Sequence, residues 1–156
     1  MDIATKLDTL TLLAQTFREN HIEWALGGST LLYLKGIVKE FNDIDIMIKE
    51  QDADRIEKLI ERITNCEIGI SVDSDKFSYH VSCRINDVPI ELFDGMKFKD
   101  GEEDKKINFS SFCVHECVML GDEVIPLMGC RDWCRWYLAL GNLDKAEQIY
   151  KMNHLW

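Results

Sequence analysis

The spacing of apolar residues predicts helices at both ends of the chain and in its first half. From Ile3 to about Asn20 apolar side chains recur every three to four residues, which is the period of an amphipathic helix. The same period runs from Gln51 to about Thr64, and it returns over Arg131–Leu140 and Leu143–Met152. A shorter helix is expected over Ser29–Gly36.

Runs in which apolar and polar residues alternate predict strands, because successive side chains of a strand point to opposite faces. Asn86-Asp87 is typical of a turn, and Asp100–Lys106 is expected to be a charged loop. Strands and helices mix without regular alternation, and no repeat or linker divides residues 1–156, so we expect a single α+β domain with a mixed β-sheet and helices packed on it. The expected strands are Ile22–Leu26, Asp43–Ile48, Glu67–Val72, Phe77–Ile85, Val88–Phe93, Phe112–Leu120 and Glu123–Leu127.

The charge balance narrows the classes of partner. The 156 residues include 18 Lys and Arg against 28 Asp and Glu, a net charge of -10. Such a surface disfavours docking along nucleic acid or an anionic membrane, because both need clustered cations. No apolar run is long enough to span a bilayer, and the first residues do not resemble a signal peptide. We therefore expect a soluble, cytoplasmic protein.

The six cysteines give little evidence of chemistry. Cys113 and Cys117 lie four residues apart, and Cys130 and Cys134 repeat that spacing. Zinc sites more often use a two-residue gap on a short loop. We interpret these side chains as buried thiols rather than metal ligands.

Asp43 and Asp45 are the first candidates for chemistry. They stand two apart in a predicted strand, so both carboxylates project from one face, while Ile44 and Ile46 face the core. Two such carboxylates can converge on one Mg²⁺. The alternative is a strand with one solvent-exposed face, in which alternating Asp and Ile carry no function.

Gly27-Gly28-Ser29 lies between a predicted strand and a predicted helix. Glycine lets the backbone approach a ligand closely, and the helix start directs N–H groups and the Ser29 hydroxyl toward it. Such a turn suits the outer phosphates of a nucleotide. The alternative is a tight turn with Ser29 as an ordinary N-cap.

Gly28-Ser29, thirteen further residues and then Asp43-Ile44-Asp45-Ile46 resemble the signature of the polymerase-beta-type nucleotidyltransferases. The small size and the layout are similar to the lincosamide and aminoglycoside nucleotidyltransferases. The resemblance implies that the Gly-Ser turn holds nucleotide phosphates and that Asp43 and Asp45 bind divalent metal. It also implies a third carboxylate on a neighbouring strand.

Two acids are candidates for that third carboxylate. Glu91 stands in the middle of an apolar predicted strand, where a charge is costly without a partner. Asp94 is the second choice, because it stands beside Gly95 and is expected to start a turn. We prefer Glu91, with strand register as the open point.

Other positions depart from the family pattern or allow two interpretations. Lys39 is a candidate phosphate contact or a solvated lysine, and Phe41 stands where relatives often carry His. His80 is a candidate base or an ordinary strand histidine. Trp133, Trp136 and Tyr137 follow helical spacing, which indicates core packing, although an aromatic ring can also stack on a base.

The leading hypothesis is a metal-dependent nucleotidyltransferase. It would use one or two Mg²⁺ to move an NMP group from an NTP to a hydroxyl of a small, antibiotic-like molecule or of a protein, and a homodimer would complete the acceptor pocket. The alternative is a catalytically weak binding protein of this type, such as an antitoxin that acts through a partner protein. A purely structural role would leave every acid at the surface.

Overall fold

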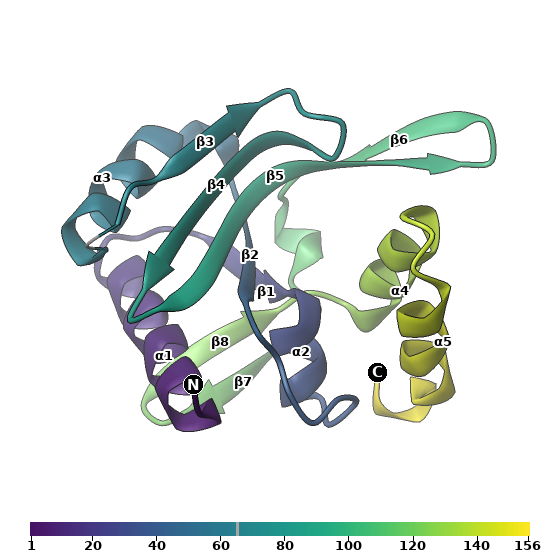
Figure 1. Ribbon diagram of the computed structural model, residues 1–156, viewed down its shortest axis with the longest axis horizontal. Helices are drawn as coiled ribbons and strands as arrows, with labels where there is room; N and C mark the ends of the chain where they lie inside the picture. The colour runs from purple at the N-terminus through teal and green to yellow at the C-terminus, as the bar shows by residue number, and fades with distance from the viewer. Residues whose placement is uncertain (65) are drawn as a thin grey trace.

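The computed structural model describes residues 1–64 and 66–156 (Figure 1). Within these ranges no helix combines the length and the apolar character needed to cross a membrane. The helices are α1 (Ile3–Glu19), α2 (Gly28–Leu34), α3 (Ala53–Ile63), α4 (Cys130–Ala139) and α5 (Leu143–Lys151), with short 3-10 turns at Glu50–Asp52, Ser111–Cys113 and Asn153–Leu155. The strands are β1 (Trp24–Gly27), β2 (Ile44–Ile48), β3 (Gly69–Val72), β4 (Phe77–Ile85), β5 (Val88–Asp100), β6 (Glu103–Ile107), β7 (Glu116–Leu120) and β8 (Glu123–Leu127).

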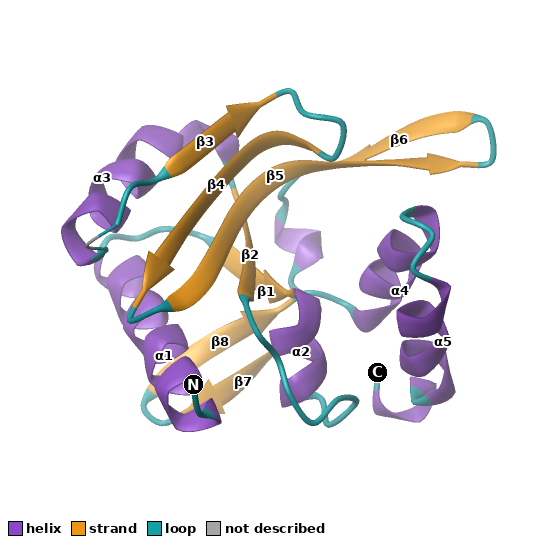
Figure 2. Ribbon diagram, viewed as in Figure 1, coloured by secondary structure: helices purple, strands orange, loops and turns teal. Residues whose placement is uncertain are grey.

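The strands form one mixed sheet in the order β3-β4-β5-β2-β1-β8-β7, and β6 pairs with the outer part of β5. β2 runs parallel to β5 and β1 runs parallel to β8, whereas the other neighbours are antiparallel. Helices α1 and α3 lie on one side of the sheet, and α4 and α5 lie on the other (Figure 2). The expected α+β fold with a mixed sheet is confirmed.

The central strand β2 separates a core face from a functional face. Ile44, Ile46 and Ile48 have no solvent exposure, whereas Asp45 remains partly accessible between them. Full burial of an isoleucine stabilises the fold by about 1.5–3 kcal/mol. The isoleucines of β2 therefore anchor the strand in the core, whereas the Asp45 side chain does not take part in this packing.

The expected charged loop over Asp100–Lys106 is wrong, because this segment is half of a hairpin. Strand β5 continues to Asp100, the chain turns at Gly101 with a φ of 66°, and β6 returns along it. Lys97 pairs with Lys106 across the two strands. Side chains near the tip of this hairpin are exposed, so backbone hydrogen bonds hold it without the apolar alternation from which strands are predicted.

Asp94 neither starts a turn nor joins the other candidate acids. It lies within β5, pairs with Tyr79 and is buried. Its carboxylate accepts hydrogen bonds from the backbone N–H groups of Glu50, Gly95 and Phe109, each at 2.8 Å. The following Gly95 has a φ of 67°, a conformation that glycine adopts without strain. Asp94 thus ties three segments together at a bend of β5.

The interpretation of the cysteines as buried thiols holds for three of the four. Cys113, Cys130 and Cys134 are buried, and burial raises the pKa of the Cys130 thiol to about 11. Cys117 is exposed instead, because it lies on the edge strand β7 with its side chain away from the core.

Candidate active site

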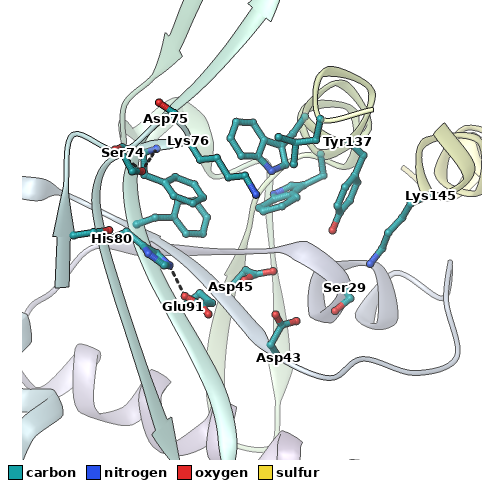
Figure 3. Close-up of a pocket in the computed structure, with 16 residues that line it drawn as sticks. Ser29, Asp43, Asp45, Ser74, Asp75, Lys76, His80, Glu91, Tyr137 and Lys145 are labelled. Atoms are coloured by element: carbon teal, nitrogen blue, oxygen red, sulfur yellow. Dashed lines mark hydrogen bonds and ion pairs between the residues drawn. The ribbon is translucent and has the colours of Figure 1, made fainter. Parts of the chain in front are cut away.

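The residues at the base of the candidate site, called its floor below, form one row across four neighbouring strands of the sheet. Ser82 on β4 is in register with Glu91 on β5, and Glu91 is in register with Asp45 on β2. Asp45 is in register with Gly27 on β1. Residues paired in this way project from one face of a sheet. Asp43 precedes Asp45 by two residues, and the structure places the three carboxylates on one face (Figure 3).

The Gly-Gly pair allows two close approaches at this floor. Gly28 has a φ of 60°, and a Cβ atom there would collide with the carboxylate of Asp45. A Cβ atom on Gly27 would collide with the indole of Trp133 on α4. The glycines therefore let the strand-to-helix turn pack directly against the acid and let α4 close over β1.

Two hydrogen bonds fix the backbone near the acids, one between α2 and the start of β2 and the other at the end of β1. The Thr30 hydroxyl donates to the backbone carbonyl of Asp43 at 2.7 Å. Met128 donates its backbone N–H to the carbonyl of Leu26 at 2.9 Å, which joins the end of β1 to the start of α4. Ser29 lies in the first turn of α2, faces the same pocket as Asp43 and is 9% exposed.

Glu91 is held by neighbours on β4. Its Oε2 forms a short contact with Nε2 of His80, and its Oε1 accepts a hydrogen bond from the Ser82 hydroxyl at 3.2 Å. Figure 3 shows His80 and Glu91 directed at each other on one side of the two aspartates. His80, which allowed two interpretations from sequence, therefore lies in the candidate site and contacts Glu91.

The surroundings of Asp45 strongly shift the pKa of its carboxyl group. Burial of its carboxyl group, with the nearby charges of Asp43 and Glu91, raises the pKa of Asp45 to about 8, and Lys145 partly opposes this shift. Burial, Asp45 and Asp43 likewise raise the pKa of Tyr137 above its usual range. A carboxyl group held this way gains from a cation that relieves the repulsion.

These groups open into a cavity of about 660 Å³ between the sheet and α4 and α5. Aromatic rings form its wall. Phe77 stacks on Phe93 with ring centroids 4.9 Å apart, and Trp133 lies 6.1 Å from Phe93 and 5.6 Å from Tyr137. The core packing expected for Trp133, Trp136 and Tyr137 is confirmed, since all three are buried, and the same rings line the cavity.

Two lysines of the cavity were missed by the sequence interpretation. Lys145 on α5 extends toward Ser29, and its ammonium group lies 5.0 Å from the ring centroid of Tyr137 (Figure 3). Lys76 enters from the connection between β3 and β4. Neither lysine belongs to a motif that the sequence singled out. Lys39, the lysine singled out from sequence, is exposed and lines an adjacent hollow that shares Ser29 and Lys145 with the cavity.

The donor set fits a divalent cation as an open two-carboxylate site. In residues 1–64 and 66–156, neither Asp43 nor Asp45 accepts a hydrogen bond on its carboxylate, and no group of three or more His, Cys, Asp or Glu side chains is arranged to hold a metal ion. Mg²⁺ is commonly bound by one or two carboxylates, with water and substrate phosphates as its other ligands. The unpartnered pair suits that mode, whereas both oxygens of Glu91 are already engaged.

Comparison with known proteins gives matches to solved structures. A candidate nucleotidyltransferase from Thermotoga maritima superposes with a TM-score of 0.72 at 22% identity, over 99% of this chain and 96% of that one. The chain has the nucleotidyltransferase fold. ANT(2'')-Ia in complex with adenylyl-2''-tobramycin matches with a TM-score of 0.62 at 10% identity, over 95% of this chain and 89% of that one.

A third solved structure extends the likeness to an antibiotic-modifying enzyme of another class. The lincosamide antibiotic adenylyltransferase LnuA, with lincomycin bound, matches this nucleotidyltransferase fold with a TM-score of 0.53 at 16% identity, over 79% of this chain and 80% of that one. No family model matches the chain, and no curated protein does. The expected fold is thus confirmed by structure rather than by sequence similarity.

Proposed function

We propose that this protein is a metal-dependent nucleotidyltransferase that moves an NMP group from an NTP to a hydroxyl group. The observation that carries the proposal is the pair Asp43 and Asp45, whose carboxylates accept no hydrogen bond from any described residue, with Asp45 packed against Gly28 in a nucleotidyltransferase fold. Both aspartates would hold Mg²⁺, and Glu91, in register with Asp45, would contribute to a second ion if His80 or Ser82 released one of its oxygens. Bound Mg²⁺ would supply positive charge against the phosphate oxygens and acidify the attacking hydroxyl.

The side of the cavity that carries Ser29 is assigned to the donor. Ser29 and the backbone of Gly27-Gly28 would bind the β- and γ-phosphates, and Lys145 would add charge from α5. Lys39 borders the adjacent hollow and would contact the phosphate tail at its outer end. Cations at this end would stabilise the pyrophosphate that leaves.

The acceptor hydroxyl is assigned to the side that carries Glu91 and His80. Its oxygen forms a bond to the α-phosphorus while the bond from that phosphorus to pyrophosphate breaks, and its proton leaves to the Glu91–His80 pair. Phe93, which follows Glu91 by two residues, has no titratable group and contributes an apolar ring to the wall of the cavity.

Calorimetric titration tests the donor half of the proposal. Non-hydrolysable analogues of ATP, GTP, CTP and UTP are titrated with Mg²⁺ and again with EDTA, for the natural protein and for Asp43→Asn/Asp45→Asn. We expect binding of at least one analogue that needs both Mg²⁺ and the aspartates. The matched control is Asp8→Asn/Asp54→Asn, which removes two exposed acids outside the cavity. Equal binding by the active-site variant and this control would overturn the proposal.

A weakly catalytic binding protein is the second candidate, favoured by the engagement of both Glu91 oxygens. It would bind nucleotide without releasing pyrophosphate and would co-purify with a partner protein. Pyrophosphate release, measured over a panel of hydroxyl compounds, separates the two candidates. A homodimer that completes the acceptor pocket stays a prediction, and light scattering that shows only monomer at working concentration would contradict it.

A further inference from the structure

The half of the cavity farthest from Ser29 lies away from the residues assigned to the phosphates of the donor. Figure 3 shows Ser29 and Lys145 on one side of the two aspartates, with His80 and Lys76 toward the other. The connection between β3 and β4 borders this acceptor half (Figure 3). Its chemistry therefore bears on what the acceptor is.

Aromatic side chains contribute to the lining of the acceptor half. Phe77 stacks on the His80 imidazole with centroids 5.2 Å apart and planes 22° apart, and Trp136 lies 5.6 Å from Phe77. Leu140 lines the same cavity and is 42% exposed, and Leu143 beyond it is 63% exposed. Aromatic rings thus lie beside the Glu91–His80 pair.

The charge directed into this half is positive. Lys76 extends into the cavity, whereas the carboxylate of the neighbouring Asp75 points away from it (Figure 3). Lys76 forms no ion pair with any residue that the structure describes, although Lys97 beside it pairs with Asp73 at 3.3 Å. Glu91 is already paired with His80, so its charge is less available to a cationic acceptor.

We propose that the acceptor is a hydroxyl compound with an aromatic ring or a similarly flat apolar face, neutral or anionic rather than cationic. Its flat face would pack on the wall at Phe77 and Trp136, and Lys76 would face its carboxylate or other anionic group. Aminoglycosides, which carry several ammonium groups, fit this half poorly. The inference rests on the proposed function, because it assigns the acceptor of that same site.

Three small probes separate the contributions of ring and charge. 4-Hydroxyphenylacetate has a ring and a carboxylate, tyramine has the same phenol with an ammonium group, and 4-hydroxybutyrate keeps hydroxyl and carboxylate without a ring. Binding is measured by ligand-observed NMR with Mg²⁺ and the tightest NTP analogue bound, so that the aspartates are already neutralised. The variant is Lys76→Glu, and the control is Lys58→Glu, which changes an exposed lysine of α3 outside the cavity.

We expect 4-hydroxyphenylacetate to bind about two- to fivefold more tightly than tyramine, the range of one exposed ion pair. It should also bind more tightly than 4-hydroxybutyrate. Lys76→Glu should reverse the order of the two phenols, and Lys58→Glu should preserve it. Four outcomes would each overturn this inference while leaving the proposed function intact. Tyramine or 4-hydroxybutyrate could bind as tightly as 4-hydroxyphenylacetate. Alternatively, Lys76→Glu could leave the order of the two phenols unchanged, or neither phenol could bind. Loss of Mg²⁺-dependent nucleotide binding itself overturns the proposed function as well.

Discussion

Asp45 and Asp94 are two acids of one sheet with opposite surroundings. Asp94 is 7% exposed, and three backbone N–H groups satisfy its carboxylate. Asp45 accepts no hydrogen bond on its carboxylate from any described residue, and burial, together with the charges of Asp43 and Glu91, raises its pKa to about 8. Backbone donors mark an acid that holds the fold together, whereas clustered acids without donors mark a place for a cation.

The largest expected effect is on catalysis at the clustered acids. Asp43→Asn/Asp45→Asn should lower the rate of pyrophosphate release by at least about a hundredfold, because the metal-binding carboxylates are lost. The same variant should unfold at an equal or higher urea concentration than the natural protein in EDTA, since the repulsion is relieved. A variant that keeps its activity would remove the distinction between the two acids.

Asp94 should show the reverse pattern. Asp94→Ala leaves three backbone N–H groups of buried or half-buried segments without their acceptor, which should cost about 3 kcal/mol of unfolding free energy. Nucleotide affinity of the protein that remains folded should change little, since Asp94 lies outside the cavity. Urea unfolding and calorimetry on the same preparation measure both quantities. Normal stability together with lost affinity would assign Asp94 to the site.

The contact between Gly28 and Asp45 can be separated from backbone strain. Gly28→Ala places a Cβ atom against the Asp45 carboxylate in a backbone with φ of 60°. Gly101→Ala meets nothing within 4 Å at a φ of 66°, and thus measures the strain alone, about 1 kcal/mol. Gly28→Ala should lose more stability than this control and should also weaken Mg²⁺-dependent nucleotide binding. Equal effects of the two variants would show that the close approach is not needed.

A smaller effect is expected in the pH dependence of metal binding. The folded pKa of Asp45 lies above its unfolded value of 3.8, so its stabilising contribution is present at low pH and is lost as pH rises from about 4 to about 8. Mg²⁺ competes with that proton. The melting temperature gained on adding Mg²⁺ should therefore be larger at about pH 8.5 than at about pH 5.5. Asp8→Asn/Asp54→Asn should keep this difference, and a gain independent of pH would argue against a metal on Asp45.

The sequence predicted the parts of the site that depend on local spacing. The spacing of Asp43 and Asp45 predicted that they share a face, although Asp43 lies just before β2, and two adjacent glycines predicted the break after β1. Glu91 was preferred over Asp94 because of its apolar strand, and the register with Asp45 now gives the geometric reason to place it beside the pair.

The remaining features of the cavity and the sheet depend on long-range packing, which local sequence patterns do not reveal. Lys76 and Lys145 reach the cavity from segments about 70 residues apart, and no local pattern marks where their side chains end. The register of β4 against β5 brings His80 to Glu91, and a slip of one residue would have turned it to the other face. The β5–β6 hairpin was missed because its exposed strands lack an apolar face.

The central claim is that Asp43 and Asp45 hold a divalent cation beside the Gly28-Ser29 turn. Titration with Mn²⁺, followed by electron paramagnetic resonance with and without an NTP analogue, observes that cation directly. The account predicts one or two bound ions whose spectrum changes when the analogue is added, in the natural protein and in Asp8→Asn/Asp54→Asn alike, and their loss in Asp43→Asn/Asp45→Asn. The same bound Mn²⁺ in that last variant would contradict it.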